Sequence, residues 1–226
     1  MTRDSQALDG VEARNLTCER GGRIVFRNLD FEIARGHLLA LEGPNGAGKT
    51  SALRMLAGLL APAAGTIGFH TGERVITDGE ERGRLVGWIG HLDGIKAQLT
   101  VIENVRVYAG LYRAKRGVRA KHGARGERGE SAALERVGLA RLADLPSQYL
   151  SAGQRRRLAL ARLIVSARPL WLLDEPLAAL DAAGKRLTAE LITGHCAGGG
   201  IVIAATHEAL NVEGARPSLG LEMGSA

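Results

Sequence analysis

Cysteine is scarce in this sequence, and residues that commonly bind metals do not gather. Among the 226 residues only Cys18 and Cys196 are cysteines, and no metal-ligand spacing relates them. Two isolated cysteines are more often small apolar residues than a disulfide or a redox pair. The six histidines likewise form no zinc-type cluster. These absences argue against a disulfide framework and against a zinc-binding module.

Long apolar runs and a secretion signal are also absent. Runs such as residues 170–173 are far shorter than the roughly 18 residues that a transmembrane helix needs. The first ten residues are polar and lack the apolar middle region of a signal peptide. No internal repeat or low-complexity tract stands out. We therefore expect a soluble, cytoplasmic chain that reaches a membrane only by docking on another protein.

Positive charge exceeds negative charge, with a net charge of +6 and a pI near 9.8. Part of the excess is local, because residues 113–128 hold seven Lys or Arg and a single acid, Glu127. This basic stretch fits a solvated loop, or a contact with acidic lipid headgroups or with an acidic protein surface. It contains no aromatic residue that would stack on bases, so we expect no nucleic-acid partner.

Short apolar runs that alternate with helical patterns predict an α/β fold with a mostly parallel sheet. Residues 37–41 resemble a buried strand that leads into a glycine-rich loop, and residues 49–60 follow as a helix. Residues 170–173 and 201–205 are continuous apolar runs suited to central strands.

The region from about residue 91 to 167 is rich in helix formers and poor in strand patterns. Thr100 and Glu103 have capping-box spacing, so a helix is expected to begin there, and Ser131 and Ser151 are candidate N-caps of two more. We predict one domain over residues 1–226, with an α/β core at about 12–90 and 168–210 and an inserted helical subdomain at about 91–167.

The glycine-rich loop matches the phosphate-binding pattern G-x-x-x-x-G-K-[ST] at every fixed position. Phosphate binding needs backbone N–H groups that converge on the anion, and glycine leaves room for that approach. A helix that begins at Lys49 adds the attraction of its N-terminus. We expect Lys49 to reach the β- and γ-phosphates of ATP and the Thr50 hydroxyl to bind Mg²⁺. The predicted nucleotide-binding residues here are Gly43, Pro44, Asn45, Gly46, Ala47, Gly48, Lys49, Thr50 and Ser51.

Two further patterns follow along the chain. The apolar run at residues 170–173 ends in Asp174 and Glu175, where Asp174 is suited to hold Mg²⁺ and Glu175 to polarise the attacking water. Ser151 and the N–H groups after it form a second potential anion site at a helix N-terminus.

In this order and spacing, the motifs resemble those of the ABC ATPase family over about residues 12–210. The Walker A motif corresponds to residues 43–50, the signature to 150–154 and Walker B to 170–174. The likeness continues with Glu175 as the catalytic carboxylate, a D-loop at residues 179–181 and a switch residue, His207. The signature departs from the family pattern in one place, since Ala152 stands where glycine is usual.

The resemblance implies a homodimer in which two subunits form a head-to-tail nucleotide sandwich. Ser151, Gly153 and Gln154 of one subunit would then complete the MgATP site whose γ-phosphate is held by Lys49 of the other. His207 would contact the γ-phosphate, and Asp181 would link the two sites. Integral membrane subunits are the implied partners, which places the chain peripherally on the cytoplasmic face of the inner membrane.

Two positions depart from the family pattern. His91 stands where the family usually has a glutamine, unless Gln98 is the true equivalent, and a histidine there can still contact the Mg²⁺-water shell. Histidine titrates near neutral pH, where glutamine does not. No aromatic residue stands at the expected adenine-stacking position, where Arg20 offers a planar guanidinium or is a plain surface residue.

These details resemble the cytochrome c maturation branch, whose ATPase is described as a haem exporter subunit. The resemblance rests on Arg20, His91 and stretches such as residues 149–157 and 170–177, and the end of the chain soon after His207 agrees. We expect an ATPase that couples MgATP hydrolysis to haem handling or export. An ABC ATPase for another small molecule, or a soluble one acting on nucleic acid or the ribosome, are the alternatives.

Overall fold

The computed structural model describes residues 8–115, 124–207, 210, 212 and 219–220, and its contacts divide the chain into two units. The first unit comprises Met1–Trp88, Arg168–Pro176 and Ala189–Ala226, and the second comprises Ile89–Ala167 and Leu177–Thr188. The second unit therefore includes Leu177–Thr188, which follows the strand at residues 170–174 and lies outside the stretch of residues 91–167 expected from sequence. Residues 116–123 of the basic stretch at residues 113–128 lie outside the described residues.

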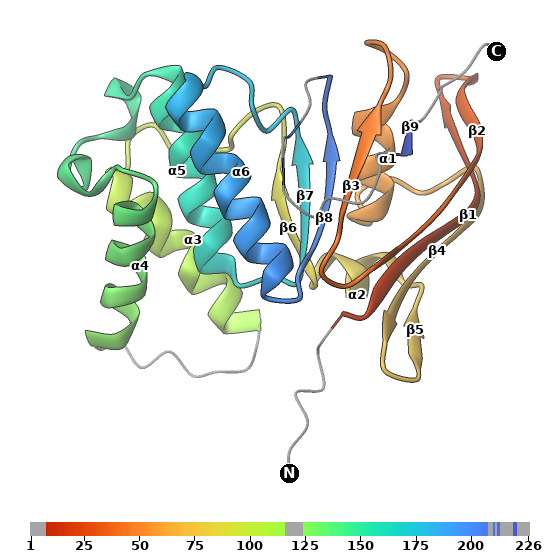
Figure 1. Cartoon of the computed structure of the whole chain (residues 1–226), viewed down its shortest axis with the longest axis horizontal. Coiled ribbons are helices and arrows are strands. Elements are labelled where there is room, and N and C mark those ends of the chain that lie inside the picture. Colours follow the sequence, from red (N-terminus) through yellow and green to blue (C-terminus); the bar gives the residue numbers. More distant parts are fainter. Residues whose placement is uncertain (1–7, 116–123, 208–209, 211, 213–218, 221–226) are drawn as a thin grey trace. The chain divides into compact units, whose positions relative to one another are not determined.

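A five-stranded sheet of order β6-β7-β8-β3-β9 carries the glycine-rich loop of the first unit (Figure 1). β3 pairs in parallel with β8 and with β9, and β7 pairs in parallel with β8. Every residue of β7 and β8 is buried, as expected for strands covered on both faces. The predicted α/β fold is confirmed. The bounds are β3 (Leu38–Glu42), β6 (Val86–Ile89), β7 (Leu170–Asp174), β8 (Ile201–Ala205) and β9 (Leu219–Gly220).

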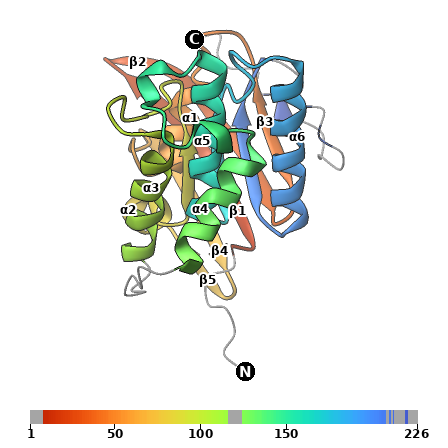
Figure 2. The same ribbon diagram turned by 90° about the vertical axis from the view of Figure 1, so that its left-hand side faces the viewer.

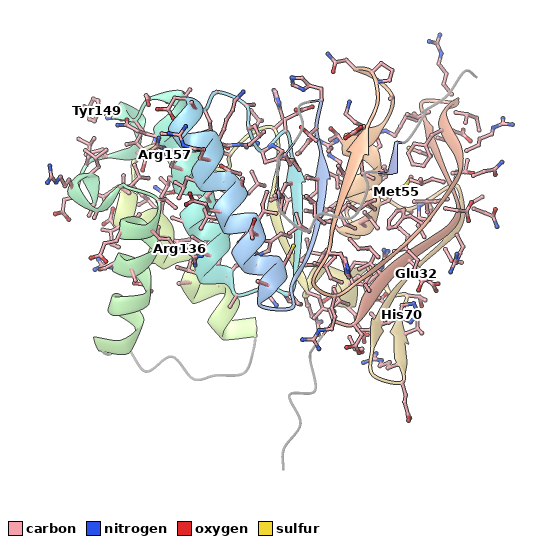
Figure 3. The ribbon with its side chains drawn as sticks, viewed as in Figure 1. Glu32, Met55, His70, Arg136, Tyr149 and Arg157 are labelled. Atoms are coloured by element: carbon pink, nitrogen blue, oxygen red, sulfur yellow. The ribbon has the colours of Figure 1, made fainter. Side chains whose placement is uncertain are left out.

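A second, antiparallel sheet of order β2-β1-β4-β5 was not predicted from sequence. Along β2 the buried residues Leu29, Phe31 and Ile33 alternate with exposed ones, the pattern of a strand with one face in the core. Glu32 and His70, labelled in Figure 3, lie on β2 and β4; Glu32 forms an ion pair with Arg14, and His70 Nε2 lies 3.4 Å from Glu12 Oε1. The bounds are β1 (Gly10–Arg20), β2 (Arg23–Ala34), β4 (Ala64–Thr71) and β5 (Arg74–Ile76).

Helix α1 (Lys49–Leu56) contributes to a core shared by both sheets. Its residues Leu53, Met55 and Leu56 are fully buried, and Met55 is labelled in Figure 3. Burial of each such side chain stabilises the fold by about 2 kcal/mol, so α1 is fixed by packing on one side while its N-terminus faces the glycine-rich loop. The sheet residues in this core include Val11, Leu16, Phe31, Leu41, Phe69, Leu172 and Ile203.

Helix α1 ends at Leu56, four residues before the end expected from sequence. Gly58 follows with φ +74°, a left-handed conformation that ends the helix. A Cβ on Gly58 would overlap the backbone of Gly79, at the start of the short helix α2 (Gly79–Gly83). These two segments of the backbone therefore approach each other so closely that only glycine fits at residue 58. Arg82 of α2 donates to the carbonyls of Met55 and Leu56, and burial lowers the pKa of its guanidinium.

Three helices form most of the second unit (Figure 2): α3 (Val101–Lys115), α4 (Ala124–Arg136) and α5 (Ala152–Ser166). Two single-turn helices, Ala140–Leu142 and Ser147–Tyr149, connect α4 to α5, and α6 (Ala182–Ala197) starts in this unit. None of the helices in the described ranges is both long and apolar enough to span a membrane.

The predicted helix starts at Thr100 and Ser151 are confirmed, and the one at Ser131 is wrong. The Thr100 backbone N–H donates to Glu103 Oε2 at 2.8 Å, and Glu103 N–H donates back to Thr100 Oγ1 at 3.3 Å. Ser131 instead lies inside α4, since the helix begins at Ala124. A serine is a common N-cap but also tolerates an exposed helical position, so its presence alone does not mark a helix end.

His195 is a buried histidine near the end of α6, in the part that belongs to the first unit. Its ring stacks on Trp171 of β7, with centroids 3.9 Å apart and planes 8° from parallel. Its Nε2 lies 3.2 Å from the carbonyl oxygen of Pro169. Burial lowers the pKa of His195 from its ordinary 6.5 to about 4, although the backbone contacts oppose this shift. The imidazole is therefore neutral in the folded protein at neutral pH.

We predict that His195 makes the folded state less stable in mild acid. Because its pKa is lower in the folded than in the unfolded chain, its contribution is complete above pH 6.5 and is lost as the pH falls from 6.5 to 4. At pH 5 the loss is about 2 kcal/mol relative to pH 7.5. Urea unfolding of the wild type and of His195→Phe, which keeps a ring against Trp171, measures it. Equal pH dependence in both proteins would contradict the assignment.

Candidate nucleotide-binding site

The glycine-rich loop lies where the sequence predicted it, between β3 and α1. Gly43, Gly46 and Gly48 have φ values of 144°, 85° and 94°, conformations that other residues rarely adopt. Lys49 is buried, and its Nζ donates to the carbonyl oxygens of Gly43 at 2.7 Å and Pro44 at 3.2 Å. The ammonium group thus lies within the curve of the loop, while Pro44, Asn45 and Gly46 are exposed and Ala47 is buried beneath them.

Strand register brings the other predicted groups to this loop. Leu41 of β3 and Asp174 of β7 are both paired with Ala205 of β8, so the three strands end in one row. Asp174 is 3% exposed, and both of its carboxylate oxygens lie near the Thr50 hydroxyl, at 3.1 and 3.0 Å from Oγ1. A buried carboxylate and a hydroxyl that converge in this way supply oxygen donors suited to a hard cation such as Mg²⁺.

Glu175 and His207 follow the ends of β7 and β8 and contact each other. The Nδ1 atom of His207 lies 2.8 Å from Oε2 of Glu175. Glu175 has φ +49°, a conformation that is costly for a residue with a side chain and that is common at functional sites. Its backbone N–H donates to Ala205 O at 2.8 Å, which fixes the turn. The carboxylate is therefore held at the edge of the sheet rather than directed freely into solvent.

The Ser51 side chain hydrogen-bonds with a buried cysteine of the first unit, Cys18, and Arg20 acts on the same thiol through its charge. Burial raises the pKa of the Cys18 thiol, while a side-chain hydrogen bond with Ser51 and the charge of Arg20 oppose this shift. The Ser51 side chain, which follows Thr50 on α1, is thus engaged with β1. Arg20 is exposed at the end of β1, as either of its two predicted roles requires.

The signature residues lie at the start of α5 in the second unit. Ser151 is the N-cap: its Oγ accepts from Gln154 N–H at 3.2 Å, and Gln154 Oε1 accepts from Ser151 N–H at 2.8 Å. A Cβ added to Gly153 would lie 3.1 Å from the carbonyl oxygen of Ala179, so glycine allows the D-loop backbone to approach the helix closely. Ser151 and Ala152 are exposed, which leaves this helix N-terminus accessible.

The D-loop residue Asp181 is tied to both neighbouring helices. Its Oδ1 accepts from Gly184 N–H of α6 at 2.7 Å and from Arg157 of α5 at 3.1 Å. The hydrogen bond from Gly184 and the charge of Arg157 lower the pKa of this carboxyl group. Arg157, labelled in Figure 3, was not predicted as a site residue. Its only sequence signal is its place in the Arg155-Arg156-Arg157 run that follows the signature.

His91 lies in the loop between β6 and α3, within the second unit, and its side chain is exposed. Gln98, its alternative, is exposed in the same loop. The predicted residues thus fall into two groups. The first unit gathers Lys49, Thr50, Asp174, Glu175 and His207, while the second holds His91, Ser151, Gly153, Gln154 and Asp181.

Comparison with known proteins gives the same family as the sequence motifs. The family model described as ABC transporter matches residues 26–178. The chain is 50% identical over 203 residues to the "Cytochrome c biogenesis ATP-binding export protein CcmA" of Rhodopseudomonas palustris (strain BisB5), covering 89% of this chain and 94% of that protein. It is 48% identical to the protein of the same description from Nitrobacter winogradskyi, with the same coverage.

Solved structures agree in fold. The ATP-binding cassette MJ0796, described as a dimer in a post-hydrolysis state bound to ADP and Pi, superposes with a TM-score of 0.74 at 25% identity and 88% coverage of each chain. An ATP-binding subunit of an ABC transporter has the same TM-score and identity, and covers 87% of this chain. The chain therefore belongs to the ABC transporter family, and within it to the group of CcmA proteins.

Proposed function

We propose that the chain is the ATP-binding and ATP-hydrolysing subunit of an export complex that acts in cytochrome c biogenesis. The observation that carries the ATPase assignment is the convergence of Lys49, Thr50, Asp174 and Glu175 at one edge of the parallel sheet. The assignment to cytochrome c biogenesis rests on 50% identity over 89% of the chain with a relative so described.

The loop and Lys49 bind the phosphates of ATP. In the structure the Lys49 ammonium group donates to two loop carbonyls, which hold a cation at the centre of the loop. Phosphate oxygens are stronger acceptors than these carbonyls, so the ammonium group turns to the β- and γ-phosphates when ATP enters. The backbone N–H groups from Gly46 to Thr50 and the N-terminus of α1 complete this anion site, and Ser51 stabilises it through its contact with Cys18.

Thr50 and Asp174 hold Mg²⁺ beside the phosphates. Their oxygen atoms already lie within 3.1 Å of one another, so an ion coordinated by Thr50 is next to the buried negative charge of Asp174. When bound, the ion neutralises charge on the β- and γ-phosphate oxygens. His91 contributes a contact to the Mg²⁺ shell and the attacking water, with Gln98 as the alternative residue for that role.

Glu175 polarises the water that attacks the γ-phosphorus in line with the leaving group. His207 holds the carboxylate through the 2.8 Å contact, and the turn at Glu175 restricts its backbone. Once the γ-phosphate is bound, His207 donates to it and the Glu175 carboxylate orients the water. Arg20, exposed at the end of β1, stacks on the adenine ring.

The working form is a homodimer in which each nucleotide is bound by two subunits. Ser151, Gly153 and Gln154 supply an exposed helix N-terminus, which binds the γ-phosphate held by Lys49 of the second subunit. Asp181, next to that helix, links the two sites. The dimeric state of the MJ0796 cassette, itself bound to ADP and Pi, supports this arrangement. We take the core, predicted at residues 12–90 and 168–210, and the helical subdomain, predicted at residues 91–167, as parts of one functional domain.

Membrane subunits complete the complex, and the chain binds them at the cytoplasmic face of the inner membrane. The description of its relatives as export proteins supports this location, because export takes place across a membrane. Haem is the group whose handling or export is coupled to hydrolysis.

Replacement of Glu175 by Gln is predicted to trap a dimer with ATP. The variant keeps Lys49 and Thr50, so it binds MgATP, but it lacks the carboxylate that polarises water. We expect hydrolysis to fall by about a hundredfold or more. Sedimentation with saturating MgATP measures the dimer, and Asp144→Asn, an exposed change in the second unit, is the control. A monomeric variant that hydrolyses ATP at the wild-type rate would exclude this role for Glu175.

The cellular role is tested by the partners of the tagged wild-type chain in a host that makes c-type cytochromes. We expect the chain to co-purify with integral membrane proteins and its ATPase activity to change at least severalfold in that complex. Lys49→Ala is expected to assemble equally well but to leave the host without mature c-type cytochromes. Activation by RNA or DNA without any membrane partner would contradict the proposal, as would normal cytochrome maturation in the Lys49→Ala strain.

A further inference from the structure

Arg156 joins helix α5 to the loop that carries His91. It is only 4% exposed, and its NH1 group donates to the Gly90 carbonyl oxygen at 3.0 Å and to Asp93 Oδ1 at 2.8 Å. The two acceptors flank His91 and Leu92, so one guanidinium group holds both sides of the exposed part of the loop. All of these residues belong to the second unit.

Arg162, six residues further along α5, contacts the same loop. Its NH1 group donates to the backbone carbonyl oxygen of Asp93 at 2.7 Å. Its guanidinium carbon lies 3.4 Å from the ring centroid of Tyr108 on α3, and the residue is 5% exposed. Gly94 turns the chain with φ +61°. Asp93 is therefore bound through its side chain by one buried arginine and through its backbone by another.

The far end of the loop is fixed to α3 by Asn104. Its Oδ1 accepts from Lys96 N–H at 2.9 Å, and its Nδ2 donates to Lys96 O at 3.0 Å and to Ser147 Oγ at 3.0 Å. Asn104 is 1% exposed. With this end anchored separately, the freedom of His91 and Leu92 depends on the contacts that Arg156 and Arg162 make.

Burial distinguishes the Arg156 contact from other ion pairs on the same helix. The side chains of Arg156 and Asp93 are 5% and 21% exposed, whereas those of Arg157 and Asp181 are 25% and 70% exposed. Water competes for an exposed pair and weakens it, but a buried guanidinium group that loses its acceptors has no replacement for them. Arg156 and Arg157 are adjacent on α5, which makes Arg157 a natural comparison.

Helix α5 begins at the capping box of Ser151, five residues before Arg156. An α-helix transmits a displacement of its first turn to its later turns because its hydrogen bonds make it stiff. Any movement of the signature turn therefore also moves Arg156. The hydrogen bonds to Gly90 and Asp93 pass that movement to the loop, whose Leu92 side chain is 85% exposed.

We propose that Arg156 is a positioning residue that makes the signature turn and the His91 loop move as one body. The inference rests on the proposed function, in which a second subunit's nucleotide engages Ser151. Binding of that nucleotide then sets the position of His91 in the first subunit. Arg156 touches neither ATP nor the attacking water, and it acts through Gly90 and Asp93.

The direct test is a distance measurement on the full chain without nucleotide. Nitroxide labels are attached at Leu92→Cys in the loop and at Ala132→Cys, an exposed position on α4, in a Cys196→Ser background; Cys18 is fully buried and stays unlabelled. The parent is expected to give one narrow distance distribution. Arg156→Gln and Asp93→Asn are each expected to broaden it at least twofold, and together no further than either alone.

Two further variants serve as comparisons for the broadening of the distance distribution. Arg157→Gln removes the same charge from the adjacent position but no contact to the loop, so its distribution is expected to stay as narrow as the parent's. Arg156→Lys keeps the charge without the planar fork of donors and is expected to give an intermediate width. If Arg156→Gln does not fold, Asp93→Asn, at a partly exposed position, carries the test.

Kinetics supply the second readout. Arg156→Gln leaves Lys49, Thr50 and Ser151 unchanged, so it is expected to keep its KM for MgATP within about twofold while kcat falls about tenfold or more. Distributions as narrow as the parent's in both Arg156→Gln and Asp93→Asn would overturn the positioning role. An unlabelled wild-type chain that hydrolyses no ATP would instead overturn the proposed function, because the distance measurement requires no nucleotide.

Discussion

The register between β3, β8 and β7 determines where every catalytic group of the first unit lies. Leu41 and Asp174 are both opposite Ala205, so the three strands end level with one another. Parallel strands present their carboxyl ends at the same edge, and the residues that follow them must therefore meet there. The glycine-rich loop follows β3, Glu175 follows β7 and His207 follows β8. A shift of one residue would reverse the direction of each side chain and remove Asp174 from Thr50.

This register is maintained by burial rather than by the site itself. All residues of β7 and β8 are buried, and Leu41 and α1 pack into the same core. Burying a polar group at this edge of the sheet costs free energy, as for Asp174, which is 3% exposed. The burial of the apolar side chains of the strands offsets that cost. In the second unit, helix α5 likewise positions the site residues. It begins at Ser151, and its residues Arg156 and Arg157 hold the His91 loop and the D-loop through Asp93 and Asp181.

Local patterns predicted those parts of the structure that local interactions determine. The glycine-rich loop, the Ser151 capping box and the strand at residues 201–205 each depend on a few adjacent residues, and each was predicted from sequence. Contacts distant in sequence were not predicted. Helix α1 ends early because Gly58 meets Gly79, and Arg156 binds a carboxylate 63 residues away. The antiparallel sheet was missed although Leu29, Phe31 and Ile33 alternate as a half-buried strand requires.

The central claim is that each nucleotide is bound by Lys49 of one subunit and Ser151 of another, and mixing two defective proteins tests it most directly. Lys49→Ala and Ser151→Arg are each combined with Glu175→Gln, and sedimentation with saturating MgATP is measured for each protein alone and for an equal mixture. Each protein alone has two defective sites per dimer, so the account predicts monomers. The mixed dimer has one complete site, formed by Lys49 of the Ser151→Arg protein and Ser151 of the Lys49→Ala protein, so dimers are predicted in the mixture. A mixture that stays as monomeric as its components would contradict the account.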